Sequence, residues 1–355
     1  MKLYYPESLY DSNPKHRFAL FPLLKVFIKS DTFIDNPAKE VFGFSNQKMQ
    51  LVKQLEAANI IILPMSWDFY VNQKKEALAK AFIEKMNRLN KIVFVFISGD
   101  FGVHIPDFSN VRVFRCSGYM SKLPNSHLGL PVFHRDPIHR YYDSEHVILR
   151  SYNAKPTIGF CGQASQSLSN RIQETLRVVH RNLKYYFKFV KMSPQKIQST
   201  SFNRFKILSQ LQSASNIKTN FIVRDQYGGG VKHGRGVTKV AEEYFENMKN
   251  SDYIVCYRGA GNFSVRFYET LAMGRIPVYI NTDGLLPLSN SINWKEHLVW
   301  VEPFEINTIS EKVLEFHKSL NAEQFEAIQI KNRKLWKESL NLWSFFFNQF
   351  QLIQN

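Results

Sequence analysis

Short, continuously apolar runs alternate along this chain with longer segments whose apolar residues recur at helical spacing. Runs of this kind form strands that are buried on both faces, and such strands occur in parallel sheets whose crossover connections are helices. The predicted strands are Asn59–Leu63, Ile92–Ile97, Val111–Phe114, Thr157–Phe160, Asn220–Val223, Tyr253–Tyr257, Pro277–Ile280 and His297–Val301. The predicted helices are Lys48–Ala58, Lys74–Asn90, Leu168–Phe189, Thr238–Asn250, Ser264–Met273 and Asn307–Leu320. The alternation therefore predicts an α/β fold.

The alternation pauses once, between Asn125 and Tyr152, where prolines accumulate and periodicity is lost, which predicts a loop. A chain of 355 residues suits two domains. We expect a Rossmann-like domain over residues 1–152, a second over 153–325, and a terminal segment over 326–355. Within that last segment Lys331–Phe350 has helical spacing, typical of a helix packed on the body or of one facing a membrane. The ligand cleft should lie between the two domains, at the carboxyl ends of the strands.

The charge balance indicates an anionic partner. The chain has 46 Lys and Arg against 30 Asp and Glu, a formal net charge of +16. Nucleic acid, a phosphorylated ligand and an acidic membrane face all fit such a balance. The segment Arg171–Lys206 concentrates basic and aromatic residues, which fits an anionic lipid surface, a nucleic acid or simply a solvated helix face.

Three cysteines and the absence of a bilayer-length apolar run favour a protein of the cytoplasm. Any membrane contact is expected to be peripheral, at the inner face of the cell membrane.

The segment Asn250–Glu302 carries the most specific pattern: a strand, a glycine-containing loop, a helix and another strand. A loop of this kind exposes backbone amides at a helix N-terminus, where a diphosphate binds readily. Arg258 and Arg266 flank the loop with forked donors that suit phosphate oxygens. Glu269, one turn into the helix, is placed to accept hydrogen bonds from a ribose diol, unless it only forms an i,i+3 ion pair with Arg266.

This run resembles the exostosin family of glycosyltransferases. That family carries a serine before a buried strand, then Arg-Gly, Arg-Phe-x-Glu-Ala, Gly-x-x-Pro-Val, and Leu-Pro-Phe followed by Asp-Trp. The corresponding residues here are Ser251, Arg258-Gly259, 266–270, 274–278, Leu286-Pro287-Leu288 and Asn293-Trp294, with departures at Thr270, Leu288 and Asn293. Weaker similarities lie at 58–64, 99–102 and 155–162.

The resemblance implies a GT-B fold, with two Rossmann-like domains facing each other across a cleft, and inverting transfer from a nucleotide sugar, usually a uridine diphosphate (UDP) sugar. It implies a donor site made by Gly162, Gln163, Arg258, Gly259, Asn262, Ser264, Arg266, Phe267 and Glu269. Retaining GT-B enzymes carry a second glutamate eight positions before the helix glutamate, where this chain has Gly261, which favours inversion. The chain has no Asp-x-Asp pair to hold a divalent ion, so we expect no metal and no cofactor besides the nucleotide-sugar co-substrate.

An inverting transfer needs a general base for the acceptor hydroxyl. Asp68 and Asp100 both follow predicted strands of the first domain, and Asp68 is placed slightly ahead because Trp67 beside it could stack on an acceptor sugar. Each carboxylate also fits an ordinary loop or helix-capping role. His16 and His134 are weaker candidates for the base, and His134 is a further candidate acceptor contact.

The leading hypothesis is a glycosyltransferase of surface polysaccharide assembly (capsule, O-antigen or lipopolysaccharide) acting on a glycan or lipid-linked glycan acceptor. A basic nucleic-acid-binding protein and a GT-B epimerase of nucleotide sugars are the alternatives. The glycine-rich segment Tyr227–Gly236 is either a loop that closes over an anionic ligand or a plain surface loop.

Overall fold

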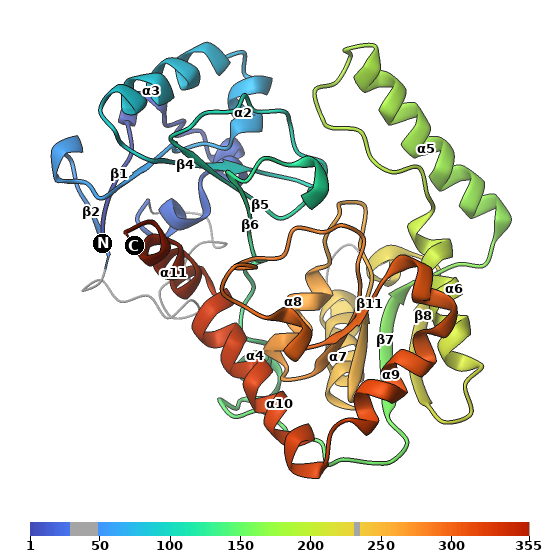
Figure 1. Cartoon of the computed structure of the whole chain (residues 1–355). Coiled ribbons are helices and arrows are strands. Elements are labelled where there is room, and N and C mark those ends of the chain that lie inside the picture. Colours follow the sequence, from blue (N-terminus) through green and yellow to red (C-terminus); the bar gives the residue numbers. More distant parts are fainter. Residues whose placement is uncertain (29–48, 231–234, 355) are drawn as a thin grey trace.

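The computed structural model describes residues 1–28, 49–230 and 235–354, and Figure 1 shows two α/β domains. The first sheet has the strand order β2-β1-β3-β4-β5-β6, and every neighbouring pair is parallel. Its strands are β1 (Lys2–Tyr4), β2 (Gln50–Leu51), β3 (Ile60–Ile62), β4 (Val93–Ile97), β5 (Val111–Arg115) and β6 (His127–Gly129). Strands β3 and β4 are buried along their whole length, as their apolar runs predict.

The second sheet has the order β11-β10-β9-β7-β8 and is also parallel throughout. Its strands are β7 (Thr157–Gln163), β8 (Lys218–Arg224), β9 (Tyr253–Cys256), β10 (Ile276–Ile280) and β11 (Val299–Val301). The chain passes from β7 to β8 on one side and returns to β9 on the other, so the strand order reverses between β7 and β9. Ligands of doubly wound sheets bind outside the carboxyl ends of the strands at such a point. The expected pair of parallel-sheet α/β domains is confirmed.

Helices cover the sheets and connect the domains. They are α2 (Trp67–Asn72), α3 (Glu76–Arg88), α4 (Pro137–Tyr142), α5 (Leu168–Tyr186), α6 (Thr200–Gln212), α7 (Arg235–Lys249), α8 (Val265–Ala272), α9 (Ile309–Lys318), α10 (Ala322–Leu335) and α11 (Leu342–Gln354). Helix α3 illustrates the local logic: Ala79, Ile83 and Met86 recur at helical spacing and are buried. An acidic first turn and a basic last turn complement its dipole.

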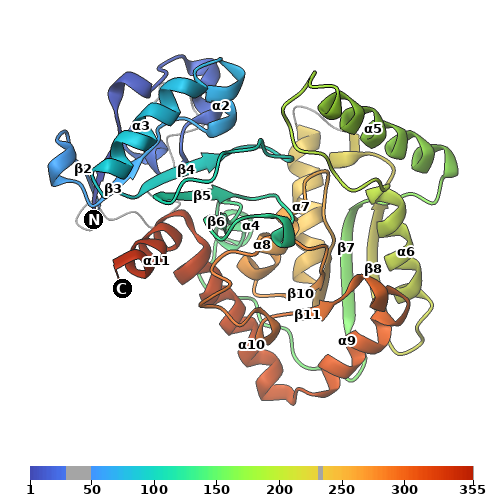
Figure 2. The same ribbon diagram turned by 45° about the horizontal axis from the view of Figure 1, so that its top comes forward.

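The C-terminal segment crosses back to the first domain (Figure 2). Phe345 and Phe346 of α11 are completely buried in the first domain's core, and the Phe346 ring lies 5.2 Å from that of Phe114 on β5. The single helix expected over 331–350 is wrong, because α10 and a π-helical turn end at Asn341, whose backbone is extended. The Asn341 side chain then caps α11 by accepting a hydrogen bond from the Ser344 amide.

Two further expectations differ from the structure. The described part of the helix expected over 48–58 instead contains β2 and a 3₁₀ turn at Leu55–Ala57. The region expected to be a loop between 125 and 152 contributes β6 and α4. Asp136 caps α4 and pairs with Arg333 of α10 at 2.5 Å, which ties this connection to the C-terminal helices.

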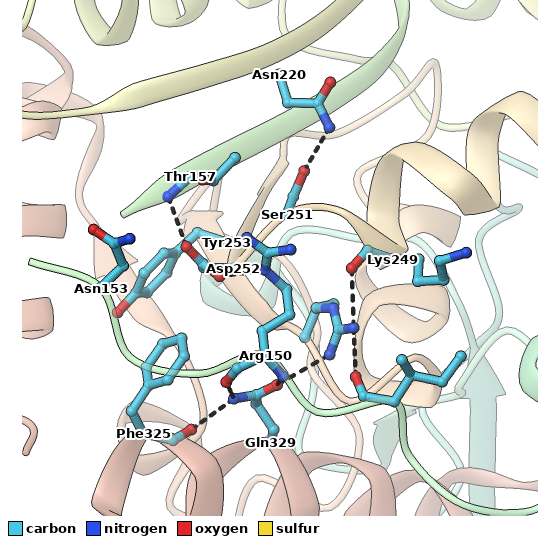
Figure 3. Close-up of polar contacts among 12 residues, drawn as sticks. Arg150, Asn153, Thr157, Asn220, Lys249, Ser251, Asp252, Tyr253, Phe325 and Gln329 are labelled. Carbon is cyan, nitrogen blue, oxygen red and sulfur yellow. Dashed lines mark hydrogen bonds and ion pairs between the residues drawn. The ribbon is translucent and has the colours of Figure 1, made fainter. Parts of the chain in front are cut away.

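The start of the second domain is anchored by a buried carboxylate (Figure 3). Asp252, directly before β9, accepts hydrogen bonds from the Thr157 amide at 2.7 Å and from the Arg150 guanidinium at 2.5 Å. Gln329 of α10 binds both the amide and the carbonyl of Arg150. These contacts hold the amino ends of β7 and β9 in register and leave their carboxyl ends for a ligand.

Candidate functional site

A cavity of about 1030 Å³ lies at the carboxyl ends of β9, β10 and β11. Residues 257–258, 280–283, 302–303 and 306–307 contribute from the sheet edge, and residues of α5, α6 and the connection between them cover it. Tyr119 and Lys122 contribute from the first domain. The cavity therefore lies between the domains, where the fold predicts the cleft.

The cavity wall carries an excess of positive charge. Four basic side chains line it, and none has a carboxylate partner among the residues that the structure describes; they are Lys122, Lys196, Lys206 and Arg258. The two lining carboxylates are already engaged. Asp283 accepts two hydrogen bonds from Ser121, and Glu302 accepts from Asn281 and Trp300. A cavity with unpaired cations and satisfied carboxylates is suited to an anionic ligand.

Arg258 is 4% exposed and contacts both domains. Nη1 donates to the Tyr119 hydroxyl at 2.8 Å, and Nη2 donates to Gln195 Oε1 and to the Ala260 carbonyl, both at 3.1 Å. The guanidinium has five N–H donors, so one Nη1 proton remains for a ligand. Arg258 is the predicted donor residue that the structure places in the cavity.

Asn262, a predicted donor-site residue, has a buried side chain with structural contacts. It is 1% exposed, and its amide nitrogen donates to the carbonyls of Gly118, Thr282 and Asp283 at 2.8–3.0 Å. Its oxygen accepts from the Thr282 hydroxyl. Because the side chain is fully committed, it holds the loop after β9 to the loop after β10 and to the first domain.

Arg266 and Glu269 lie on α8, outside the cavity lining. Arg266 donates to the Cys161 carbonyl at 2.7 Å and stacks over the Phe160 ring, which ties α8 to the end of β7. Glu269 Oε2 accepts a 2.5 Å hydrogen bond from the Tyr244 hydroxyl of α7. No Arg266–Glu269 ion pair is found among the described residues, so the simple ion-pair alternative is wrong.

The Glu269 carboxylate is partly exposed, and its Oε1 accepts no hydrogen bond from the described residues. Burial and the neighbouring Glu269 raise the pKa of Tyr244 well above its usual value, so the phenol stays a donor. Tyr244 therefore fixes the carboxylate and leaves one oxygen for a ligand hydroxyl.

Gly162 and Gln163 end β7 beside Arg266. A Cβ on Gly162 would lie 2.6 Å from Arg266 Nη2, so the guanidinium packs directly against this glycine. Arg204 of α6 donates to the carbonyls of Gln163 and Arg258 at 2.9 and 3.0 Å. It thereby joins the ends of β7 and β9 at the point where strand order reverses.

The other motif residues divide between surface and core. Gly259 and Ser264 are partly exposed in the loop and at the N-cap of α8. Phe267, also predicted in the donor site, is 2% exposed and packs on Tyr279 and Trp294, so its side chain belongs to the core. Ser251 lies at the amino end of β9, remote from the cleft, and donates to the Asn247 carbonyl. Its hydroxyl also accepts from Asn220 (Figure 3).

The residues predicted on the acceptor side differ more from their expected roles. Trp67 is completely buried and its indole donates to the His104 carbonyl, so it offers no face to a sugar. Both oxygens of Asp68 accept hydrogen bonds from Ser98, at 2.7 and 2.5 Å. Asp68 therefore holds α2 to the end of β4, and its placement ahead of Asp100 is not supported by these contacts.

Asp100 is exposed in the loop after β4, and this loop contacts the second domain. A Cβ on Gly261 would lie 2.7 Å from the Asp100 carbonyl, so the loop after β9 packs directly on the Asp100 backbone. Burial and the charge of Arg258 lower the pKa of Arg181, whereas the carboxylate of Asp100 raises it. The charges of Asp100, Arg181 and Arg258 are therefore close enough to interact.

The histidines lie elsewhere. His134 stacks on Trp336 at 5.2 Å beside the C-terminal crossing, and His16 bonds to Asp11 in the first domain. Neither lines the cavity. Of the glycine-rich segment, 227–230 forms a 3₁₀ turn, and 231–234 lie outside the described residues.

Sequence reasoning missed Tyr119, Gln195 and Arg204. Tyr119 and Gln195 come from irregular segments without a motif, and only the fold brings them to Arg258. Arg204 belongs to the basic segment 171–206, where its charge was visible but its bridging position was not. Among the described residues, no cluster of metal-ligating side chains is found, and no helix is long and apolar enough to cross a membrane.

Comparison with known proteins shows which proteins this chain resembles. No protein-family model matches the chain. It is 26% identical to exostosin-1 of Drosophila melanogaster over 113 residues, 32% of this chain and 14% of the relative. It is 35% identical over 72 residues to an exostosin-1 homolog of Caenorhabditis elegans, 20% of this chain and 19% of that protein. Over these lengths the chain is exostosin-like.

A third relative is a probable glucuronosyltransferase of Oryza sativa subsp. japonica. The exostosin-like chain is 37% identical to it over 60 residues, which are 17% of this chain and 14% of that protein. Among solved structures, TarM of S. aureus overlaps 82% of this chain and 55% of its own at 12% identity and a TM-score of 0.36. WaaG, a glycosyltransferase involved in lipopolysaccharide biosynthesis, overlaps 93% of this chain and 86% of its own at 12% identity and a TM-score of 0.32. At scores this low the fold assignment rests on the strand order of the exostosin-like chain itself.

Proposed function

We propose that this exostosin-like chain is an inverting, metal-independent glycosyltransferase that moves a sugar from a UDP-sugar to a hydroxyl of a glycan acceptor. The observation that carries the proposal is the interdomain cavity, whose four basic side chains lack carboxylate partners within the described chain. A diphosphate supplies the missing negative charge. The uridine nucleotide is the donor that the exostosin resemblance implies.

Arg258 contacts the donor diphosphate in this proposal, because its remaining Nη1 proton and its charge are available in the cavity. Glu269 Oε1 accepts from the ribose, and Tyr244 positions the carboxylate through Oε2. Gly162, Gln163, Gly259 and Ser264 form the backbone around the donor, and Arg266 holds the strand ends that present it.

Asp100 is the proposed general base. It takes the proton of the acceptor hydroxyl as the acceptor oxygen forms its bond to the anomeric carbon. The bond from that carbon to the diphosphate breaks on the opposite side, and UDP leaves with the electron pair. Direct displacement of this kind inverts the anomeric configuration. Gly261 supports the inverting displacement, because retaining enzymes carry a second glutamate at this position. A Cβ on Gly261 would also lie 2.6 Å from the Phe263 ring, which leaves no space for a glutamate.

The cavity cations stabilise the departing diphosphate in place of a divalent ion. The formal charge of +16 suits acceptors of surface polysaccharide assembly, which are often anionic and lipid-linked.

Donor turnover tests the proposal. The protein is incubated with a panel of UDP-sugars in the presence of a chelator, and UDP release and sugar products are measured with and without glycan acceptors. The expected result is acceptor-dependent UDP release that the chelator leaves intact. Conversion of the UDP-sugar into an epimer without UDP release would instead identify a nucleotide-sugar epimerase.

A further inference from the structure

Helix α5 presents an exposed apolar stripe. At about 100° per residue, six of its side chains fall on one side of the helix: Leu168, Ile172, Leu176, Val179, Leu183 and Tyr186. Leu168, Ile172 and Leu176 are 59–66% exposed. The stripe runs for about 27 Å at 1.5 Å per residue. Figures 1 and 2 both show α5 at the outer edge of the second domain.

The stripe continues beyond the helix. Tyr186, Phe187 and Phe189 are 68–79% exposed and lie where α5 ends. Scattered apolar residues on a surface are normal, but a contiguous set marks an interaction site. Aromatic side chains at one end of an amphipathic helix are typical of insertion at a membrane–water interface.

The charged residues of α5 and of the segment after it favour an anionic partner. Arg177 and Lys184 are exposed on α5, about 120–140° around the helix axis from the middle of the stripe. Lys188 and Lys191 are exposed just after the helix, where Lys191 Nζ lies 3.9 Å from Glu76 Oε2. The only acidic residue of α5, Glu174, faces inward and accepts hydrogen bonds from Ser199 and Ser201. In a dimer formed through this face, the same cations of the two copies would face and repel each other. Nucleic acid offers the aliphatic stripe no apolar surface to cover it.

We propose that α5 and the aromatic residues after it bind the surface of an anionic lipid bilayer. Leu168, Ile172 and Leu176 of the stripe enter the headgroup boundary. The exposed lysines and arginines of this segment reach lipid phosphates with their long side chains. The stripe also forms part of the cavity wall through Val179, Leu183 and Tyr186. A bilayer held against α5 therefore lies beside the interdomain cavity, and membrane binding needs no catalytic activity.

The experiment is flotation of the full chain with vesicles of equimolar phosphatidylglycerol and phosphatidylcholine, compared with phosphatidylcholine alone. The wild-type protein is expected to bind only the anionic vesicles. Ile172→Gln with Leu176→Gln should weaken the partition coefficient at least about tenfold, because two apolar side chains no longer leave water. Leu78→Gln with Leu89→Gln, at exposed apolar sites on and next to α3, is the matched control and should bind as wild type.

The charge contribution has its own pair of variants. Arg177→Glu with Lys184→Glu should weaken binding by about 25-fold or more, since each basic residue near an anionic surface contributes about fivefold. Lys85→Glu with Arg88→Glu on α3 makes the same change in net charge and should retain binding.

Far-UV circular dichroism and thermal unfolding confirm that each variant folds. The proposal is overturned if wild-type protein does not float, if stripe and control variants bind equally, or if the stripe variant abolishes a dimer instead.

Discussion

Replacing Arg258 by Met tests the cavity as the donor site. The side chain is almost fully buried and has no carboxylate partner among the described residues, so its removal also removes the cost of a buried cation. We therefore expect Arg258→Met to remain folded. A hydrogen bond to a charged group contributes about 1.5–3 kcal/mol, so UDP affinity should fall about 10- to 150-fold.

Isothermal titration calorimetry with UDP measures the loss. Arg258→Lys keeps the charge without the forked geometry and should fall between wild type and Arg258→Met. Tyr119→Phe is the matched control, because it deletes the hydroxyl that Nη1 contacts and leaves the guanidinium in place. Its UDP affinity should be unchanged or higher, by at most about tenfold. An unchanged dissociation constant in Arg258→Met would refute the assignment of the diphosphate to this cavity.

Four further predictions concern Glu269, Asp100, Asp68 and His127. Glu269→Gln should weaken UDP binding, measured by calorimetry, by about tenfold or more, while its melting temperature stays within a few degrees of wild type. An affinity equal to that of wild type would refute the assignment of Glu269 to the ribose. Asp100→Asn should lower kcat about 10²–10⁴-fold with intact UDP affinity. Asp68→Asn should instead cost about 1–3 kcal/mol of stability and keep kcat, and the opposite pattern would restore Asp68 as the base. Burial, with Arg115, lowers the pKa of His127 from 6.5 to about 4. The unfolded chain therefore takes up a proton first, and the unfolding free energy should fall by about 3 kcal/mol between about pH 6.5 and pH 4. Denaturant titrations of His127→Gln should lose that slope.

The architecture could be predicted from the sequence because parallel strands buried on both faces leave an unambiguous signature. Runs such as Ile92–Ile97 and Tyr253–Tyr257 are apolar at every position, which few other structures require. Edge strands escaped detection: β2 and β6 are short, and no continuous apolar run marks them. The break at Asn341 also has no periodic signal, since the apolar spacing continues through it.

The site was predictable only where a motif fixes backbone geometry. The position of Arg258 after a buried strand was enough to place it at the cleft. Burial, by contrast, depends on what other segments pack against a side chain. Trp67 and Phe267 look like ligand contacts in sequence but face cores built from distant residues. The partners of Arg258, Tyr119 and Gln195, come from segments far away along the chain.

Thermal unfolding of the wild-type chain with nucleoside diphosphates and their sugars, in the presence of a chelator, tests the central claim most directly. A ligand at one hundred times its dissociation constant adds about 2.7 kcal/mol of stability. The account predicts that UDP and at least one UDP-sugar raise the melting temperature, and that Arg258→Met reduces the rise to about half or less. No rise with any nucleotide, or a rise with nucleic acid alone, would contradict it.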